Sequence, residues 1–123
     1  MKVFFDTCIH IDISRGAQSA QQLLGGDTLR ISPIVVSELL RGARTKKAER
    51  EISKLASQLL PVEPASWRDA WTTAGFMVRK LGLEHQNDVL LALSARSAGA
   101  MLVTRDRGFE RIRELASFPL RLV

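Results

Sequence analysis

Short apolar runs alternate with longer amphipathic segments along this chain, and the alternation predicts its architecture. The apolar runs predict strands over residues 2–5, 28–31, 60–63, 100–103 and 120–123. The segments between them predict helices over residues 9–24 with a break at 14–16, then 33–42, 46–59, 66–81, 87–98 and 107–114. Strands that alternate with helices favour a parallel sheet with helices on both faces.

Capping and proline residues set several of these boundaries. Ser32 is placed to cap the helix that Pro33 opens, because proline is favoured at the first helical position. The strand at 60–63 is expected at an edge of the sheet, since Pro61 has no N–H to give to a neighbour. Asn87 and Asp88 are expected to form the N-cap and first turn of a helix that is apolar on most sides and therefore buried.

Acidic residues stand at the ends of predicted strands and at the starts of the helices around them. Asp6 follows the first strand, and Thr104 and Asp106 follow the strand before the last one. Glu38 lies about two turns into the helix after the second strand, and Asp88 begins the buried helix. Since binding chemistry in parallel sheets sits at the carboxyl ends of the strands, the four acids are expected to converge.

Such a cluster of carboxylates needs a compensating charge. Four carboxylates about 6 Å apart at an effective dielectric near 20 repel one another by roughly 15 kcal/mol in total. The stability of a whole domain is only about 5–15 kcal/mol. The cluster therefore indicates protonation, ion pairing or bound cations, and hard oxygen ligands at an open site suit Mg²⁺ or Mn²⁺. Taken singly, Asp88 also fits a helix N-terminal acid, and Glu38 also fits an ion pair with Arg41.

Composition and charge narrow the chemistry. The chain has 123 residues, 46% hydrophobic and 25% charged, as in an ordinary globular domain, and its one cysteine excludes an internal disulfide. It shows neither a secretory signal nor an apolar run near the roughly 20 residues of a membrane helix, so a cytoplasmic setting without membrane contact is expected. His10, His85 and Cys8 lack the spacing of zinc ligands.

The net charge of +5, most of it carried by arginine, suits a polyanion, although the same charge also favours plain solubility. An acidic metal pocket on a basic chain predicts a phosphodiester substrate, whose cleavage a metal ion assists by lowering the pKa of an attacking water. The candidate phosphate-binding residues are Arg41, Arg44, Arg79, Arg96, Arg105 and Arg107.

Four sequence blocks together resemble the PIN domain family, and specifically its small VapC-like toxin ribonucleases. The blocks are residues 5–7 (FDT), 37–43 (SELLRGA), 87–92 (NDVLLA) and 102–109 (LVTRDRGF). Their order and spacing extend the resemblance over the whole chain, as a single domain of residues 1–123. The resemblance implies a three-layer α/β/α fold around a central parallel sheet of four to five strands. It also implies RNA cleavage that depends on Mg²⁺ or Mn²⁺.

The resemblance assigns roles to the polar residues at the strand ends. It implies that Asp6, Asp88 and Asp106 ligate the metal ion most directly. Glu38 would ligate it through water or orient the nucleophile, and Thr104 would hydrogen-bond a carboxylate or the substrate phosphate. The expected RNA contacts among the arginines are Arg41, Arg105 and Arg107.

Two positions depart from the family pattern. Cys8 stands where many relatives have Ser or Asn, so a polar contact near the site is expected to be lost. Gly108 stands where a further acid is common, which is expected to weaken a second metal site. Asp12 is either an extra acid near the pocket or a residue on an exposed helix face.

The resemblance also implies two protein partners. The first is a small antitoxin that inserts a segment into the acidic groove, and the second is another copy of the chain in a homodimer. Trp67, Trp71, Phe76 and Met77 offer an apolar contact face on one helix, although Trp71 and Phe76 also suit plain core packing.

Other functions fit the sequence less well. A phospho-receiver domain needs paired acids after the first strand and a late lysine, and here Asp6 stands alone and no lysine follows Lys80. A haloacid-dehalogenase-type phosphatase needs a second aspartate where Cys8 stands. A non-catalytic RNA-binding or scaffolding PIN domain, and a housekeeping or DNA-directed PIN nuclease, stay open as alternatives.

Overall fold

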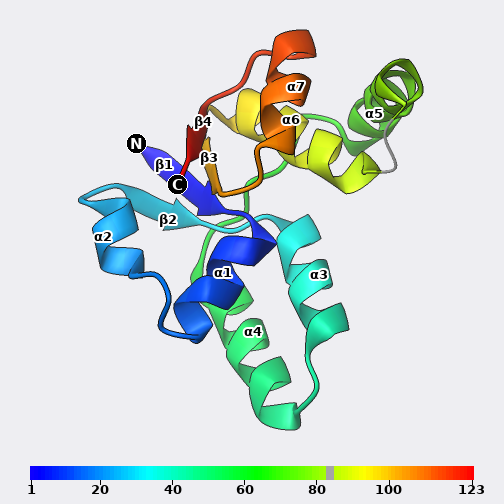
Figure 1. Cartoon of the computed structure of the whole chain (residues 1–123). Helices are drawn as coiled ribbons and strands as arrows, with labels where there is room; N and C mark the ends of the chain where they lie inside the picture. Colours follow the sequence, from blue (N-terminus) through cyan, green and yellow to red (C-terminus); the bar gives the residue numbers. More distant parts are fainter. Residues whose placement is uncertain (83–84) are drawn as a thin grey trace.

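Four parallel strands form the centre of the structure, a computed structural model that describes residues 1–82 and 85–123 (Figure 1). The strands are β1 (Lys2–Phe5), β2 (Thr28–Arg30), β3 (Met101–Thr104) and β4 (Leu120–Leu122). Their order across the sheet is β2-β1-β3-β4, and every neighbouring pair is parallel. The first strand of the chain therefore lies beside one of the last, with Phe5 opposite Val103.

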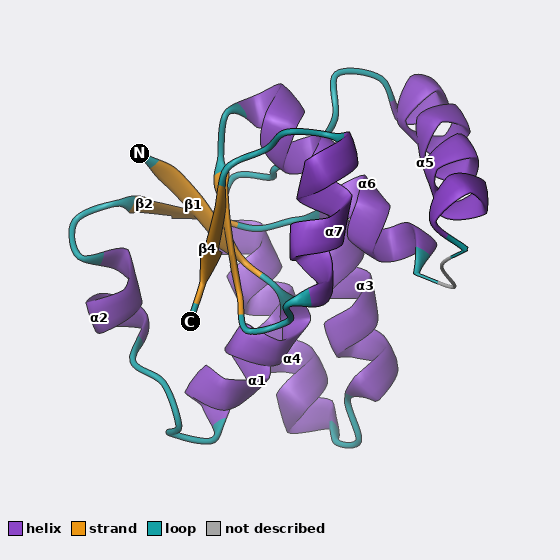
Figure 2. Ribbon diagram, turned by 45° about the horizontal axis from the view of Figure 1, so that its top comes forward, coloured by secondary structure: helices purple, strands orange, loops and turns teal. Residues whose placement is uncertain are grey.

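Helices cover both faces of this sheet, as the sequence pattern predicts (Figure 2). They are α1 (Thr7–Ser14), α2 (Ala20–Leu24), α3 (Pro33–Gly42), α4 (Lys46–Gln58), α5 (Trp67–Leu81), α6 (Gln86–Ala98) and α7 (Gly108–Leu115). Ser32 accepts a hydrogen bond from Ile34 N at the start of α3, so the predicted cap and the Pro33 helix start are confirmed. No described helix is both long enough and apolar enough to cross a bilayer.

Side chains that alternate along β1 divide the core into two halves. Val3 and Phe5 point toward α1 and α2 and pack with Val103 of β3. Phe4 points the other way and packs with Leu102 against α3, α5, α6 and α7. All five side chains are at most 1% exposed, and burying one large apolar side chain stabilises a fold by about 1.5–3 kcal/mol. Both halves of the core therefore hold β1 and β3 side by side.

The predicted strand at 60–63 is wrong in extent. This segment forms only one isolated bridge, between Ile31 and Pro61, and two backbone hydrogen bonds, from Ile31 N to Leu60 O and from Val62 N to Ile31 O. The ladder stops after this bridge because α3 begins at Pro33, so the chain beyond Ser32 offers no extended backbone to pair with.

Two helix starts also differ from the prediction. α1 begins at Thr7 rather than at residue 9, because Asp6 acts as its N-cap. α6 begins at Gln86 with His85 at the N-cap position, and no side chain caps it, so the predicted cap at Asn87 is wrong. Asp88 still lies in the first turn of α6, and this helix is buried from Val89 to Ala92 as predicted.

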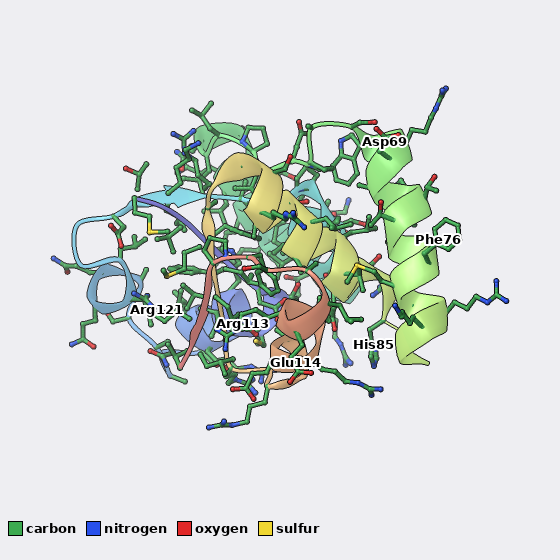
Figure 3. All side chains as sticks on the ribbon, turned by 90° about the horizontal axis from the view of Figure 1, so that it is seen from above. Asp69, Phe76, His85, Arg113, Glu114 and Arg121 are labelled. Atoms are coloured by element: carbon green, nitrogen blue, oxygen red, sulfur yellow. The ribbon has the colours of Figure 1, made fainter. Side chains whose placement is uncertain are left out.

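α5 carries the exposed aromatic residues (Figure 3). Phe76 is 68% exposed and Trp71 is 48% exposed, so neither belongs to the core. The same helix buries Ala70 and Ala74 toward α6. A helix with small residues inward and aromatic residues outward presents an apolar surface to solvent or to a partner.

Candidate functional site

The carboxyl ends of β1 and β3 meet at one edge of the sheet, next to the starts of α1 and α3 (Figure 1). Asp6 follows β1 directly, and its N–H donates to Val103 O at 3.0 Å, which continues the ladder by one residue. Its carboxylate also caps α1, with Oδ1 accepting from Thr7 N at 2.8 Å. Asp6 is 9% exposed, so its position is set by the sheet and the helix together.

Thr104, at the end of β3, joins two of the predicted acids. Its hydroxyl donates to Asp6 Oδ2 at 2.8 Å and accepts from Asp106 N at 3.0 Å. Asp106 Oδ1 in turn accepts from Gly108 N at 2.8 Å, which turns the carboxylate back toward the start of α7. The Thr104 hydroxyl is fully buried, and it fixes both the Asp6 carboxylate and the backbone of Asp106.

Cys8 keeps a polar contact that the sequence comparison suggested would be lost. Its Sγ lies 3.7 Å from Asp6 Oδ2 and 3.6 Å from Thr104 Oγ1. Because the Thr104 proton is given to Asp6, the thiol is the donor toward either oxygen. The thiol thus takes the place that a hydroxyl or amide would fill, with a longer and weaker contact.

Glu38 reaches the site from α3. Its Oε1 accepts from Thr7 Oγ1 at 3.3 Å, which ties α3 to the first residue of α1. Burial raises the pKa of Glu38, and the charge of Asp6 raises it further, while the Thr7 hydrogen bond and Arg41 act in the opposite direction. Glu38 is therefore beside Asp6, as predicted, and Arg41 is close enough to moderate its charge.

Asp88 completes the cluster from the first turn of α6. Burial raises its pKa to about 7, with further contributions from the charges of Asp6, Asp106 and Glu38, and His85 opposes the rise. Each of the other three acids therefore acts on Asp88, and Asp6 also acts on Glu38. Part of the repulsion that the sequence predicts thus falls on Asp88, where burial makes the larger contribution to the pKa.

The side chains of the acid cluster are of the chemical type that binds a divalent cation. Carboxylate oxygens are the ligands that Mg²⁺ and Mn²⁺ prefer, and a bound cation would offset the burial and the neighbouring charges that raise the pKa of Asp88. Within residues 1–82 and 85–123, however, no three His, Cys, Asp or Glu side chains are grouped closely enough to hold a metal ion between them. Metal ligation by Asp6, Glu38, Asp88 and Asp106 therefore stays a prediction.

The three arginines expected to contact RNA differ in their surroundings. Arg105 Nε donates to Asp12 Oδ2 at 2.8 Å and Nη2 donates to Oδ1 at 3.3 Å. Arg107 is 81% exposed, and its nearest ion-pair partner is Glu110 at 3.9 Å. Arg41 lies exposed in the last turn of α3. Asp12 is thus an ion-pair partner of Arg105, which neither sequence interpretation of Asp12 anticipated.

An apolar cavity of about 390 Å³ adjoins the acid cluster. It lies between α1, α3 and α4 and shares Glu38 with the cluster. Its walls include Leu39, Ile52 and Leu55, together with His10, whose Nε2 is buried without a hydrogen-bond partner among the described residues. Burial lowers the pKa of His10 to about 4, so this imidazole is neutral at physiological pH.

The fold and the site together define a class of protein: a small parallel α/β domain with a cluster of acids at the carboxyl ends of its strands. The sequence profile of the PIN domain family matches residues 3–115, and the chain belongs to this family. The family predicted from the four sequence blocks is confirmed. No curated protein matches the chain.

Solved structures that share the fold include three VapBC proteins. VapBC2 from Rickettsia felis, bound to a DNA fragment from its promoter, has a TM-score of 0.75 and 22% identity, over 100% of this chain and 99% of that chain. VapBC-1 from nontypeable Haemophilus influenzae has a TM-score of 0.73 and 22% identity, over 99% of this chain and 98% of that chain. VapBC-5 from Mycobacterium tuberculosis, a member of the VapBC family of toxin-antitoxin systems, has a TM-score of 0.66 and 18% identity, over 99% of this chain and 98% of that chain.

The sequence predicts the acids and Thr104 but not two contacts beside them, Thr7–Glu38 and Asp12–Arg105. The Thr7 hydroxyl contacts Glu38, and its signal was present in the block formed by residues 5–7. The pairing of Asp12 with Arg105 carried no signal, because 93 positions separate the two residues and no sequence pattern connects them.

Proposed function

We propose that the chain is a metal-dependent endoribonuclease, acting in the cytoplasm as the toxin of a toxin–antitoxin pair, with residues 1–123 as one domain. The observation that carries the proposal is that three acids act on Asp88: burial raises the pKa of Asp88 to about 7, and the charges of Asp6, Asp106 and Glu38 contribute to the rise. Active sites are where perturbed pKa values gather. Membership of the PIN domain family supports nuclease chemistry.

Each residue of the cluster has a role in this proposal. Asp6, Asp88 and Asp106 would hold Mg²⁺ or Mn²⁺, with Glu38 bound through water or set to orient the nucleophile. The cation would polarise the phosphoryl oxygen and lower the pKa of the attacking water. Thr104 holds Asp6 Oδ2 in place by its 2.8 Å hydrogen bond. Glu38 Oε1 is held by Thr7, and we assign its other oxygen the task of accepting a hydrogen bond from the water.

The arginines would hold the flanking phosphates of the RNA. Arg41 lies one helical turn after Glu38, and Arg107 lies next to Asp106 and is exposed. Both would lie at the rim of the acid cluster and bind a phosphate on either side of the cut bond. The net charge of +5 would favour the encounter with RNA at low salt.

A cleavage assay with a matched pair of variants tests the proposal. Purified protein free of antitoxin is incubated with structured RNA and Mg²⁺ or Mn²⁺, with a chelator control and with single-stranded DNA of the same sequence. Asp6→Asn should abolish cleavage, and Asp69→Asn, which removes an exposed acid from α5, should leave it intact. Equal activity of wild type and Asp6→Asn would refute the assignment, and RNA binding without cleavage by the wild type would favour the scaffolding alternative.

The partner we propose is an antitoxin segment lying across the apolar cavity and the acid cluster. The similar structures are VapBC proteins, and VapBC-5 belongs to a family of toxin-antitoxin systems. Because Glu38 lines the cavity and also belongs to the acid cluster, a peptide in the cavity would have the acids within its reach. A basic side chain on that peptide would take the place of the cation.

We also propose that the chain forms a homodimer through α5. Phe76 and Trp71 are the exposed aromatic residues of this helix, and aromatic side chains are enriched at protein interfaces. A contact on α5 would leave the acid cluster open, because the four acids lie on α3, on α6 and in the segments that follow β1 and β3, and none lies on α5.

A further inference from the structure

An ion pair outside the acid cluster connects the two segments that carry Asp6 and Asp106. Asp12 lies on α1, the helix that Asp6 caps, and Arg105 lies between Thr104 and Asp106. The two hydrogen bonds of this pair, 2.8 Å and 3.3 Å long, engage both oxygens of Asp12 and two nitrogens of Arg105. A bidentate contact of this kind fixes orientation as well as distance.

Two long-range contacts tie the turn after β3 to the segment of Asp6: the Thr104 hydroxyl, which donates to Asp6 Oδ2, and the Asp12–Arg105 pair. The N–H of Asp106 bonds Thr104 and its carboxylate bonds Gly108, so both bonds stay within residues 104–108. The Thr104 hydroxyl joins the base of the turn to Asp6, but neither of these local bonds ties residues 105–108 to the body of α1. The Asp12–Arg105 pair does, and Asp12 is only 16% exposed although Arg105 is 55% exposed.

We propose that the Asp12–Arg105 pair, together with the Thr104 hydroxyl, sets the spacing between Asp6 and Asp106, and that Arg105 is a positioning residue for the acid cluster rather than an RNA contact. This inference rests on the proposed function, because the spacing matters for a cation held by both acids. Metal sites require their ligands to be held within about 0.5 Å, and an exposed turn does not supply that precision by itself. Recruiting Arg105 to a phosphate would cost both of its bonds to Asp12.

Arg105→Gln tests whether Arg105 positions the Asp106 turn or acts on the acids only through its positive charge. Removing a positive charge beside the acids should strengthen cation binding if Arg105 acts only through its field. It should weaken cation binding if Arg105 holds the Asp106 turn in place. The sign of the change therefore decides between the two, and Asp12→Asn should give the same loss through the other half of the pair.

The experiment measures three quantities for Asp12→Asn, Arg105→Gln, the double variant and Arg105→Lys. These are the Kd for Mn²⁺, the hydrogen-exchange rates of the Asp106 and Gly108 amides without metal, and the affinity for RNA in chelator. Arg113→Gln and Glu114→Gln serve as matched controls, because each removes one exposed charge from the last turn of α7 (Figure 3). Because surface ion pairs contribute little to stability, all the variants should fold.

We expect each single variant to weaken Mn²⁺ binding about tenfold, the usual scale for residues that orient metal ligands. Both amides should exchange faster, the double variant should be no worse than either single one, and Arg105→Lys should recover part of the loss. Tighter Mn²⁺ binding by Arg105→Gln, or unchanged amide exchange in Asp12→Asn, would overturn the inference. A loss of RNA affinity in Arg105→Gln alone would overturn it as well.

Failure of the proposed function would look different. If the wild-type chain neither bound Mn²⁺ nor cleaved RNA, the nuclease assignment would fall. The inference would fall with it as a statement about cation binding, whereas the amide exchange rates would still report whether the pair holds the turn.

Discussion

Thr104 donates a hydrogen bond to Asp6 across 98 positions of sequence, and the same hydroxyl accepts from the N–H of Asp106. The buried Thr104 hydroxyl therefore hydrogen-bonds both the backbone of Asp106 and the side chain of Asp6. Thr104 is fully buried, so water cannot replace either bond if the hydroxyl is removed.

Thr104→Val should destabilise the protein and disrupt the cluster. The substitution keeps the shape of the side chain but leaves Asp6 Oδ2 without its closest donor and the Asp106 N–H without its acceptor, at a cost of about 1–3 kcal/mol. Urea unfolding measures the change. Thr104→Ser is the control, because it keeps the hydroxyl and should lose less than about 1 kcal/mol. A Val variant as stable as the Ser variant would contradict this account.

Asp88→Asn should change how stability depends on pH in metal-free protein. The folded-state pKa of Asp88 is raised from 3.8 to about 7, so the folded protein holds this proton more tightly than the unfolded chain does. Stability from this group is fully present below about pH 4 and is lost as the pH rises through 7. The Asn side chain does not ionise, so the variant keeps this stability as the pH rises.

At pH 7.5, thermal unfolding in chelator should therefore show a higher Tm for Asp88→Asn than for the wild type. Solvent screening of the half-buried carboxyl limits the gain to about 1 kcal/mol, or about 3–6 °C. At pH 4 the two proteins should unfold at the same temperature. An equal difference at both pH values would show that ionisation of Asp88 is not its cause.

Adding Mn²⁺ should reverse the order of these two proteins. A ligand that binds only the folded state stabilises it by about 2.7 kcal/mol at one hundred times its Kd. The wild type should gain this stability and Asp88→Asn should gain less, because it has lost one of the proposed ligands. Calorimetry with and without the cation measures the gain. The same gain in both proteins would place the cation elsewhere.

Gly108→Ala should move the Asp106 carboxylate. A Cβ on Gly108 would lie 3.1 Å from Asp106 Oδ1, closer than an ordinary contact, so the hydrogen bond from Gly108 N would be strained. We expect slower cleavage and faster exchange of the Gly108 amide. Gly75→Ala is the control: its Cβ meets no atom within 4 Å, and the change should stabilise α5 by about 0.5–1 kcal/mol.

Replacing Trp71 and Phe76 together by serine should convert a homodimer into a monomer without unfolding it. Both side chains are largely exposed, so their loss removes little of the core. Sedimentation velocity measures the mass, and RNA cleavage reports whether the acid cluster is intact. A dimer that survives the double change would show that α5 is not the interface.

The positions of the acids were predictable because strand ends can be identified in a sequence. Asp6 and Asp106 each follow a run of buried apolar residues, and parallel strands bring such ends to one edge. Thr104 was predictable for the same reason. The Asp12–Arg105 pair was not, because it depends on how α1 is rotated relative to the turn after β3, and tertiary packing sets that angle.

The extent of local structure was harder to predict than its presence. The segment around Pro61 has the apolar character of a strand, yet it forms only one bridge because its neighbour in the sheet turns into α3 at Pro33. Trp71 and Phe76 look like core residues by type, but small alanines at positions 70 and 74 occupy the inward face of α5.

The pairing of β1 with β3 has a consequence for how the protein is made. Residues 2–5 are synthesised well before Met101, where their neighbour in the sheet begins. A nascent chain, or a fragment truncated before that point, holds Asp6 without Thr104 or Asp106. The four acids can therefore meet only after Asp106 has been made, so ribosome-bound intermediates shorter than this cannot form the site.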